Sequence, residues 1–146
     1  MRIAIACDHG AIDLKNHLSV HLQSKGYEVV DFGTQTRESC DYPDYAADAA
    51  RAVASGTCQR GIVLCTTGIG VSICANKIKG IRCALLSDTK SAELTRLHND
   101  TNMMAMGAGI ISEELAFQIA DIWLSTPFSK EPRHQRRIDK MMDLEK

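Results

Sequence analysis

The residues best suited to chemistry in this sequence lie in a short segment around Cys65. An apolar run, 61–65, ends in that thiol, and the glycine-containing turn TTGIG, residues 66–70, follows it. Backbone N–H groups in such a turn can point at an anion, and the start of the next helix adds a positive partial charge. The same field favours the thiolate form of Cys65. The segment predicts an anion-binding turn beside a general base. The same sequence pattern is also typical of a tight strand-to-helix turn with a buried thiol and no function.

Three better-known phosphate loops do not match this turn. A P-loop requires Gly-Lys-Ser/Thr, but no lysine appears before Lys77. A cysteine-phosphatase loop requires an arginine six positions after the cysteine, where this chain has Val71. A dinucleotide-binding G-x-G-x-x-G requires a third glycine at position 73, where the chain has Ile73.

Two polar clusters could supply acid–base groups. Asp8-His9 directly follows the first apolar run, and His98 opens a polar cluster at 98–102 that includes Asn99. A histidine can donate or accept a proton near neutral pH. Both clusters also have a structural interpretation, because histidines often only hydrogen-bond their surroundings and Asn, Asp and Thr are common in turns.

A basic segment, RHQRR, begins the last predicted helix. Arg133 and Arg137 are four residues apart and therefore share one face of that helix. Two guanidinium groups on one face suit a phosphate. A basic helix is also a common solvated surface, so this segment alone leaves both interpretations open.

Alternating strands and helices must position these residues. Turn residues and apolar periodicity predict strands at 2–7, 27–33, 61–65, 81–87 and 103–107, and helices at 11–25, 43–55, 71–77, 88–98, 112–124 and 133–145. This order predicts a parallel sheet covered by helices on both faces. Ligands of such sheets bind beyond the carboxyl ends of the strands. The segments that directly follow strands are therefore the candidates for function.

Composition restricts the class of protein. The chain has 146 residues and no linker-like segment, which predicts a single domain over 1–146. A formal net charge of -1 makes nonspecific nucleic-acid binding a poor expectation. No apolar run approaches the roughly 20 residues of a membrane helix, and the start of the chain lacks a signal-peptide pattern. Six cysteines without a C-x-x-C pair predict free thiols in a reducing cytoplasm.

Several motifs in fixed order resemble type B ribose-5-phosphate isomerase, within the ribose and galactose phosphate isomerases. They are CDHG near the start, DYPDYA at 41–46, GIVLCTTGIGVSICANK at 61–77, GIR at 80–82, RLHNDTN at 96–102 and RHQRR at 133–137. The resemblance covers nearly the whole chain. It implies an aldose–ketose isomerase without metal or other cofactor, built as a Rossmann-like three-layer α/β/α sandwich on a five-stranded parallel sheet. It also implies a homodimer, or a tetramer formed from two such dimers, with helix 133–145 helping to form the site for a sugar phosphate.

The resemblance also assigns roles to individual residues. Cys65 resembles the base that moves a proton between C1 and C2, and Thr67 resembles the hydroxyl that assists at the sugar oxygens. His98 resembles the group that opens the furanose ring, with Asp8 nearby. The remaining assignments concern substrate binding: the enediolate loop is Thr66, Gly68, Ile69 and Gly70, the ligand expected from the other subunit is Asn99, and the phosphate site is His9, Arg133 and Arg137.

Two positions depart from the family pattern. Thr66 stands where the family usually has glycine after the catalytic cysteine, and Gly109 stands where it often has a phosphate-binding arginine. Arg136 and Arg2 are possible replacements for that arginine. Ribose 5-phosphate is the expected substrate, and other sugar phosphates, including allose 6-phosphate, galactose 6-phosphate and tetrose 4-phosphates, remain alternatives. A sugar-phosphate sensor without turnover is a further alternative, as is a flavin-binding protein, although only 5% of residues are aromatic.

Overall fold

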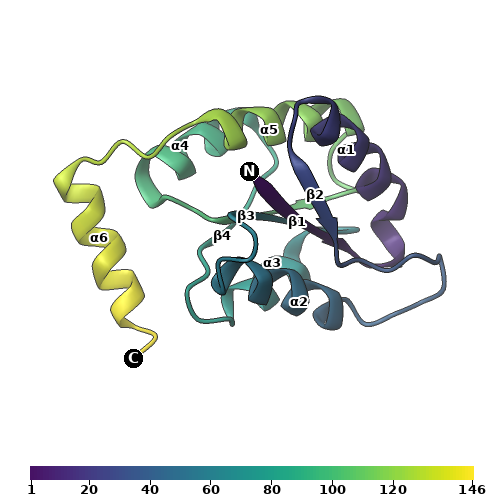
Figure 1. Ribbon diagram of the computed structural model, residues 1–146, viewed down its shortest axis with the longest axis horizontal. Coiled ribbons are helices and arrows are strands. Elements are labelled where there is room, and N and C mark those ends of the chain that lie inside the picture. The colour runs from purple at the N-terminus through teal and green to yellow at the C-terminus, as the bar shows by residue number, and fades with distance from the viewer.

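A computed structural model describes residues 1–146, and a five-stranded parallel sheet forms its centre (Figure 1). The strands are β1 (Arg2–Cys7), β2 (Glu28–Asp31), β3 (Arg60–Cys65), β4 (Cys83–Leu85) and β5 (Met103–Gly107), in the spatial order β2-β1-β3-β5-β4. Every neighbouring pair is parallel. The predicted parallel α/β fold is therefore confirmed.

Six helices and one short turn connect the strands. They are the 3-10 turn η1 (His9–Ala11), α1 (Ile12–Ser24), α2 (Tyr42–Ala54), α3 (Ile69–Asn76), α4 (Thr89–Asn99), α5 (Glu113–Ser125) and α6 (Pro132–Asp143). In Figure 1, α1, α4 and α5 cover one face of the sheet and α2 and α3 cover the other. None of these helices has the length and apolar character needed to cross a bilayer.

The two faces of the sheet differ in side-chain size. The face toward α1, α4 and α5 carries large side chains such as Ile3, Ile5 and Leu64, and these pack against Trp123. The opposite face carries Ala4, Ala6 and Ala105, which meet an alanine-rich side of α2. Alternation along each strand sends neighbouring residues to opposite faces, so both patterns come from the same strands.

The largest difference from the sequence prediction is at the edge strand β4. A strand was predicted over 81–87, but only Cys83–Leu85 pairs with β5. Side chains satisfy the backbone before it: Asn102 Oδ1 accepts from the Arg82 N–H at 2.8 Å, and Asn76 Oδ1 accepts from the Cys83 N–H at 2.8 Å. These side-chain acceptors replace the ladder at the start of the predicted strand.

The strand order reverses direction between β1 and β3. The chain leaves β1 for one edge of the sheet through β2 and returns past β1 to form β3 on the other side. Loops after two such strands diverge and leave a crevice at their carboxyl ends, where ligands of doubly wound sheets bind. Asp8, which follows β1, and Cys65, which ends β3, lie at this point.

Candidate active site

Cys65 lies at the carboxyl end of β3, in an open cavity of about 450 Å³. The cavity is lined by Asp8, Tyr42, Cys65, Thr66, Thr67, Ile69, Gly70 and Ile73. The Cys65 side chain is largely buried, and its Sγ accepts a hydrogen bond from the Gly68 N–H at 3.0 Å. The sulfur is therefore held at a fixed place beside the start of α3.

The turn after Cys65 presents unused hydrogen-bond donors. The backbone N–H groups of Thr67, Gly70 and Val71 donate to no atom of the chain. The first N–H groups of any helix lack intrahelical partners, and α3 begins at Ile69. Together with the partial charge of the helix start, these donors can stabilise negative charge on a ligand oxygen next to the Cys65 sulfur.

Close packing explains two glycines of this turn. Gly68 has φ +78°, a left-handed conformation that favours glycine, and a Cβ there would also lie 2.7 Å from the Met106 carbonyl carbon. At Gly70 a Cβ would lie 2.5 Å from Cζ of Tyr42. Tyr42, at the start of α2, is the one aromatic residue that lines the cavity. The cavity therefore lacks the pair of rings that would bracket a flavin.

Asp8 and Thr67 place two oxygen groups beside Cys65. The Asp8 carboxylate accepts from the Gly10 N–H at 2.9 Å and thereby caps the η1 turn. The Thr67 hydroxyl oxygen accepts from the Ile69 N–H at 3.2 Å. This bond leaves the hydroxyl proton of Thr67 free to be donated to a ligand oxygen. The structure thus brings together Asp8, Cys65 and Thr67, three of the four residues predicted to be catalytic.

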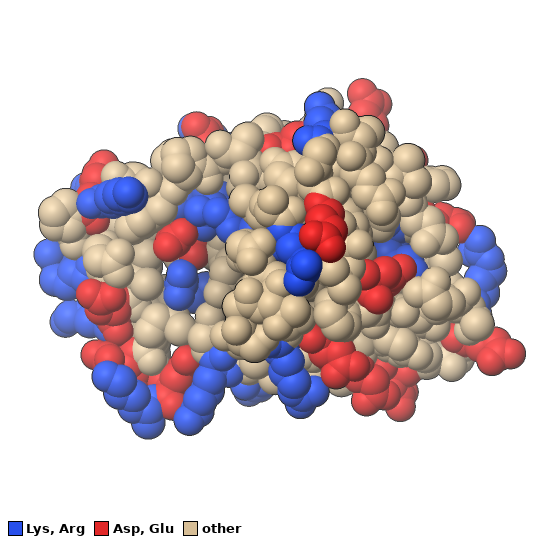
Figure 2. Space-filling view, viewed as in Figure 1, with Lys and Arg blue, Asp and Glu red and all other residues tan.

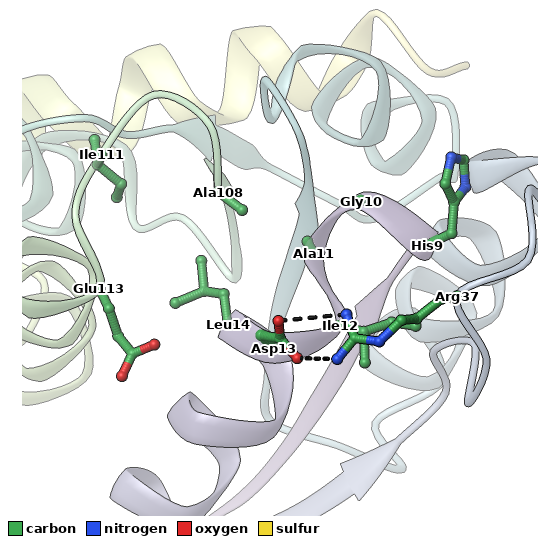
Figure 3. Close-up of a pocket in the computed structure, with 10 residues that line it drawn as sticks. All are labelled: His9, Gly10, Ala11, Ile12, Asp13, Leu14, Arg37, Ala108, Ile111 and Glu113. Atoms are coloured by element: carbon green, nitrogen blue, oxygen red, sulfur yellow. Dashed lines mark hydrogen bonds and ion pairs between the residues drawn. The ribbon is translucent and has the colours of Figure 1, made fainter.

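His9 does not line the Cys65 cavity. It lines a neighbouring cavity together with Gly10, Arg37 and Ala108, and Figure 3 shows its ring pointing away from the Asp13–Arg37 pair. Its Nδ1 accepts from the Cys40 N–H at 3.3 Å, and the Cys40 thiol lies 3.7 Å away. His9 is therefore next to Asp8 in sequence but lines a different cavity from Cys65.

His98 and Asn99 belong to a different part of the molecule. Both lie in the last turn of α4, and the ring of His98 stacks on His134 of α6 with centroids 4.5 Å apart. Asn99 Oδ1 accepts from the Thr95 hydroxyl at 3.1 Å. These two residues line a cavity beside the edge strand β4, together with Leu85 and neighbouring residues.

The ends of α4 and β3 explain why His98 and Cys65 are apart within one chain. Helix α4 runs back along the sheet, so its last residues lie at the amino ends of the strands, where the Asn102 carbonyl accepts from the Gly61 N–H. Cys65 lies at the carboxyl end of β3. The two ends of this six-residue strand are about 16 Å apart. Within a single chain, His98 therefore does not lie near Asp8, whereas the resemblance implies that the two residues act in the same site.

Arg133 and Arg137 lie on α6, which stands to one side of the sandwich (Figure 1). The predicted helix, 133–145, begins one residue earlier and ends two residues earlier in the structure. Only His134 and Ile138 of α6 are buried. Figure 2 shows blue Lys and Arg side chains gathered over this part of the surface, with acidic side chains between them. Arg133 is paired with Glu131 at 2.9 Å, whereas Arg137 makes no ion pair.

Four of the six thiols have a pKa above the ordinary cysteine value. Burial raises the pKa of Cys7 to about 12, although nearby Lys15 opposes the shift, and burial raises the pKa of Cys83 to about 12 as well. Burial also raises the pKa of Cys58 and Cys74. No three His, Cys, Asp or Glu side chains converge as a metal site would require.

Sequence reasoning missed three residues near the site: Tyr42, Ile73 and Cys40. Tyr42 and Ile73 rim the Cys65 cavity and are exposed, and Cys40 touches His9. Ile73 lies four positions after Ile69 on α3, so helical spacing could have placed it on the same face. Nothing in the sequence indicates that the 33–41 loop brings Cys40 to His9.

Comparisons with known proteins identify the family of the chain. The model of the Ribose/Galactose Isomerase family matches residues 3–141. Ribose-5-phosphate isomerase B of Escherichia coli is 44% identical over 99% of this chain and 96% of its own length. D-erythrulose-4-phosphate isomerase of Pectobacterium atrosepticum is 46% identical over 88% of this chain and 85% of its own. The structure of Clostridium thermocellum ribose-5-phosphate isomerase B superposes with a TM-score of 0.97 at 46% identity, covering 99% of this chain and 97% of that one. The chain therefore belongs to the ribose/galactose isomerase family, and it is an aldose–ketose isomerase.

Proposed function

We propose that the protein interconverts ribose 5-phosphate and ribulose 5-phosphate, with Cys65 as the base. The observation that carries the proposal is the position of the Cys65 sulfur, which lies in an open cavity beside the unused N–H groups of Thr67, Gly70 and Val71. The 44% identity to a ribose-5-phosphate isomerase B supports this substrate. The 46% identity to a D-erythrulose-4-phosphate isomerase keeps tetrose phosphates as the alternative.

The chemistry follows from the acidity of the sugar. In the open-chain aldose, the hydrogen on C2 is weakly acidic because the carbonyl at C1 can accept the charge. Cys65 removes this proton, negative charge develops on O1, and the N–H groups of the turn stabilise the enediolate. The Thr67 hydroxyl, which accepts from Ile69, donates to a sugar oxygen as protons move between O1 and O2. Return of the proton to C1 gives the ketose.

Ring opening and phosphate binding require groups that the Cys65 cavity of one chain lacks. We propose that a homodimer supplies them, with His98 and Asn99 of the partner subunit facing Asp8 and Cys65. Arg133 and Arg137 of the partner subunit, together with His9, would hold the phosphate. Three exposed apolar side chains around the cavity, Tyr42, Ile69 and Ile73, provide a surface that a second copy could cover. A two-fold axis would complete two equivalent sites.

A substrate panel tests the proposed reaction. Purified protein is assayed with ribose 5-phosphate, allose 6-phosphate, galactose 6-phosphate and erythrose 4-phosphate, and we expect the highest kcat/KM with ribose 5-phosphate. Faster turnover of erythrose 4-phosphate would move the assignment to the tetrose. Absence of turnover with every sugar phosphate would leave a binding protein and refute the proposal.

Isotope exchange tests the route of the hydrogen. In deuterium oxide, a base that exchanges its proton with solvent introduces deuterium at C1 of ribulose 5-phosphate. A direct hydride shift from C2 to C1 would leave C1 without deuterium from the solvent. We therefore expect deuterium at C1 by NMR, and complete retention of the original hydrogen would argue against Cys65 as an exchanging base.

A further inference from the structure

Thr66 fills the point where the turns after β1, β3 and β5 meet. A Cβ added at Gly10, in the turn after β1, would overlap the Thr66 hydroxyl oxygen. A Cβ added at Gly109, after β5, would lie 3.0 Å from Thr66 Cγ2 and 3.1 Å from the Thr66 carbonyl oxygen. Each branch of the threonine side chain therefore lies against a glycine. Neither glycine has a positive φ, so space rather than backbone conformation favours glycine at both positions.

Thr66 has little freedom to move from this place. The Gly109 N–H donates to its carbonyl oxygen at 2.8 Å, and the Ala108 N–H donates to the Cys65 carbonyl at 2.9 Å. These bonds fix the backbone of both turns against each other. A β-branched side chain has few χ1 rotamers, and here each branch is already in contact. Thr66 is exposed toward solvent on its remaining side, as expected for a residue on the cavity wall.

This wall separates two cavities. Thr66 lines the Cys65 cavity, and the glycine that its hydroxyl touches, Gly10, lines the neighbouring cavity of about 280 Å³. Figure 3 shows Gly10 and Ala108 on the rim of this second cavity, with His9 at its far side. Because Thr66 lines one cavity and lies against Gly10 of the other, we expect that removal of its side chain would widen the space between Gly10 and Gly109.

We propose that Thr66 limits the length of the sugar phosphate that the site accepts, so that six-carbon substrates are excluded. The proposal rests on the isomerase function proposed above. The reaction fixes C1 and C2 at the Cys65 sulfur, so every further carbon must extend away from it. In the proposed site the phosphate is held by His9, which lines the neighbouring cavity beside Gly10, so the phosphate arm would run past Thr66. One additional carbon would then require space that the Thr66 side chain occupies.

Substitution of Thr66 tests this role. We measure kcat/KM with allose 6-phosphate and with ribose 5-phosphate, and compare their ratio among variants. The wild type should prefer ribose 5-phosphate, and Thr66→Gly should raise the ratio by about tenfold or more, the usual effect of a methylene-sized change in a pocket. Thr66→Ser keeps the hydroxyl against Gly10 and removes only Cγ2, so a smaller rise is expected.

A matched control separates this effect from a general one. Thr57 is exposed and precedes β3 at the opposite end of the sheet, so Thr57→Gly should leave the ratio unchanged. An unchanged ratio in Thr66→Gly, with ribose 5-phosphate still turned over, would overturn the role of Thr66 and leave the proposed function standing. Absence of turnover of every sugar phosphate by the wild type would instead refute the function, and with it the length limit.

A stability measurement tests the contact itself without relying on turnover. Gly10→Ala should lower the melting temperature in the wild type, because the new methyl group collides with the Thr66 hydroxyl. The loss should be much smaller in Thr66→Gly, where the remaining close contact is Asp8 Oδ1 at 3.3 Å. An equal loss in both backgrounds would show that Thr66 does not fill this junction, and the length limit would then have no physical basis.

Discussion

The two ends of the sheet divide the proposed chemistry between them. The carboxyl end carries the thiol, the carboxylate and the unused N–H groups, and these are held by short backbone bonds around Cys65. The amino end carries the stacked pair of His98 and His134 and the arginines of α6. Neither end is a complete site for an isomerase. The comparison is consistent with the proposal that one chain provides the groups for proton transfer and a second copy provides those for ring opening and phosphate binding.

Loss of the base should have the largest effect at the carboxyl end. Cys65→Ala should lower kcat for ribose 5-phosphate by about 10²–10⁴-fold, the usual contribution of a positioned base. The fold should persist, because the change removes a single sulfur atom at the end of a strand. Steady-state kinetics and circular dichroism measure the two effects.

A second thiol provides the control for this variant. Cys74 lies in α3, eight residues after Thr66, and its thiol donates to the Pro43 carbonyl at 3.6 Å. Cys74→Ala should keep near-wild-type kcat. Near-wild-type kcat in Cys65→Ala would show that proton transfer uses another group.

Mixing two inactive variants tests whether the two ends meet across a dimer. Cys65→Ala and His98→Asn should each be nearly inactive with cyclic ribose 5-phosphate. After the two are unfolded together and refolded, heterodimers would contain one site with both wild-type groups. Random pairing should then restore about a quarter of wild-type activity.

The same mixture can contradict the composite site. Recovery should be absent when either variant is refolded alone. If the mixture also recovers nothing while forming dimers, Cys65 and His98 do not act in one site. His98→Asn alone should slow an open-chain analogue much less than the cyclic sugar, because only the cyclic form requires ring opening.

The arginines of α6 should have smaller effects, confined to binding. Arg133→Ala or Arg137→Ala should raise KM for ribose 5-phosphate with little change in kcat. A charged hydrogen bond contributes about 1.5–3 kcal/mol, which corresponds to a rise of roughly 10- to 150-fold. Lys140→Ala, on the same helix, is the control and should leave KM unchanged. An equal rise in all three variants would indicate general electrostatic attraction instead of a phosphate site.

The smallest expected effect is a pH dependence at the amino end. Burial against α4 lowers the pKa of His134, and the neighbouring His98, Arg133 and Arg137 lower it further, whereas Glu131 opposes the shift. The folded chain therefore binds this proton less readily than the unfolded chain does, and stability should fall as the pH drops below the ordinary value of 6.5. Urea unfolding between pH 7.5 and pH 5.5 measures the loss.

His134→Phe isolates this contribution, because phenylalanine can still stack on His98 but does not titrate. The free energy of unfolding should change less with pH in this variant than in the wild type. A parallel change in both proteins would assign the pH dependence to other groups, such as the exposed His17–Glu113 pair, whose hydrogen bond raises the pKa of His17.

Sequence patterns predicted the carboxyl end better than the amino end. Ligands of parallel sheets bind beyond the carboxyl ends of the strands, and this rule selected Asp8 and the turn after Cys65. The apolar residues that predict each strand also show where the strand ends. His98 instead ends a helix, and a helix that returns along a parallel sheet delivers its last residues to the opposite edge. In the proposed homodimer His98 acts in the site of the partner subunit, and the sequence of one chain does not show how two chains are arranged.

The loop between β2 and α2 could not be predicted for a different reason. Its path depends on Lys15, whose fully buried ammonium donates to Asp31 at 2.8 Å and to the Thr34 carbonyl at 3.0 Å. A lysine within a helix normally indicates an exposed face, so the hydrophobic pattern of the sequence does not predict that Lys15 is buried. The contact of Cys40 with His9 follows from this loop and was missed with it.

The protonated state of most thiols has a practical consequence for labelling. Burial raises the pKa of Cys7, Cys58, Cys74 and Cys83, so these four thiols should react more slowly with an alkylating reagent at neutral pH. A haloketone carried on a sugar-phosphate skeleton would be delivered to the crevice between β1 and β3, where Cys65 is the only sulfur in the wall. One equivalent of such an inhibitor per chain could then count functional sites by mass spectrometry.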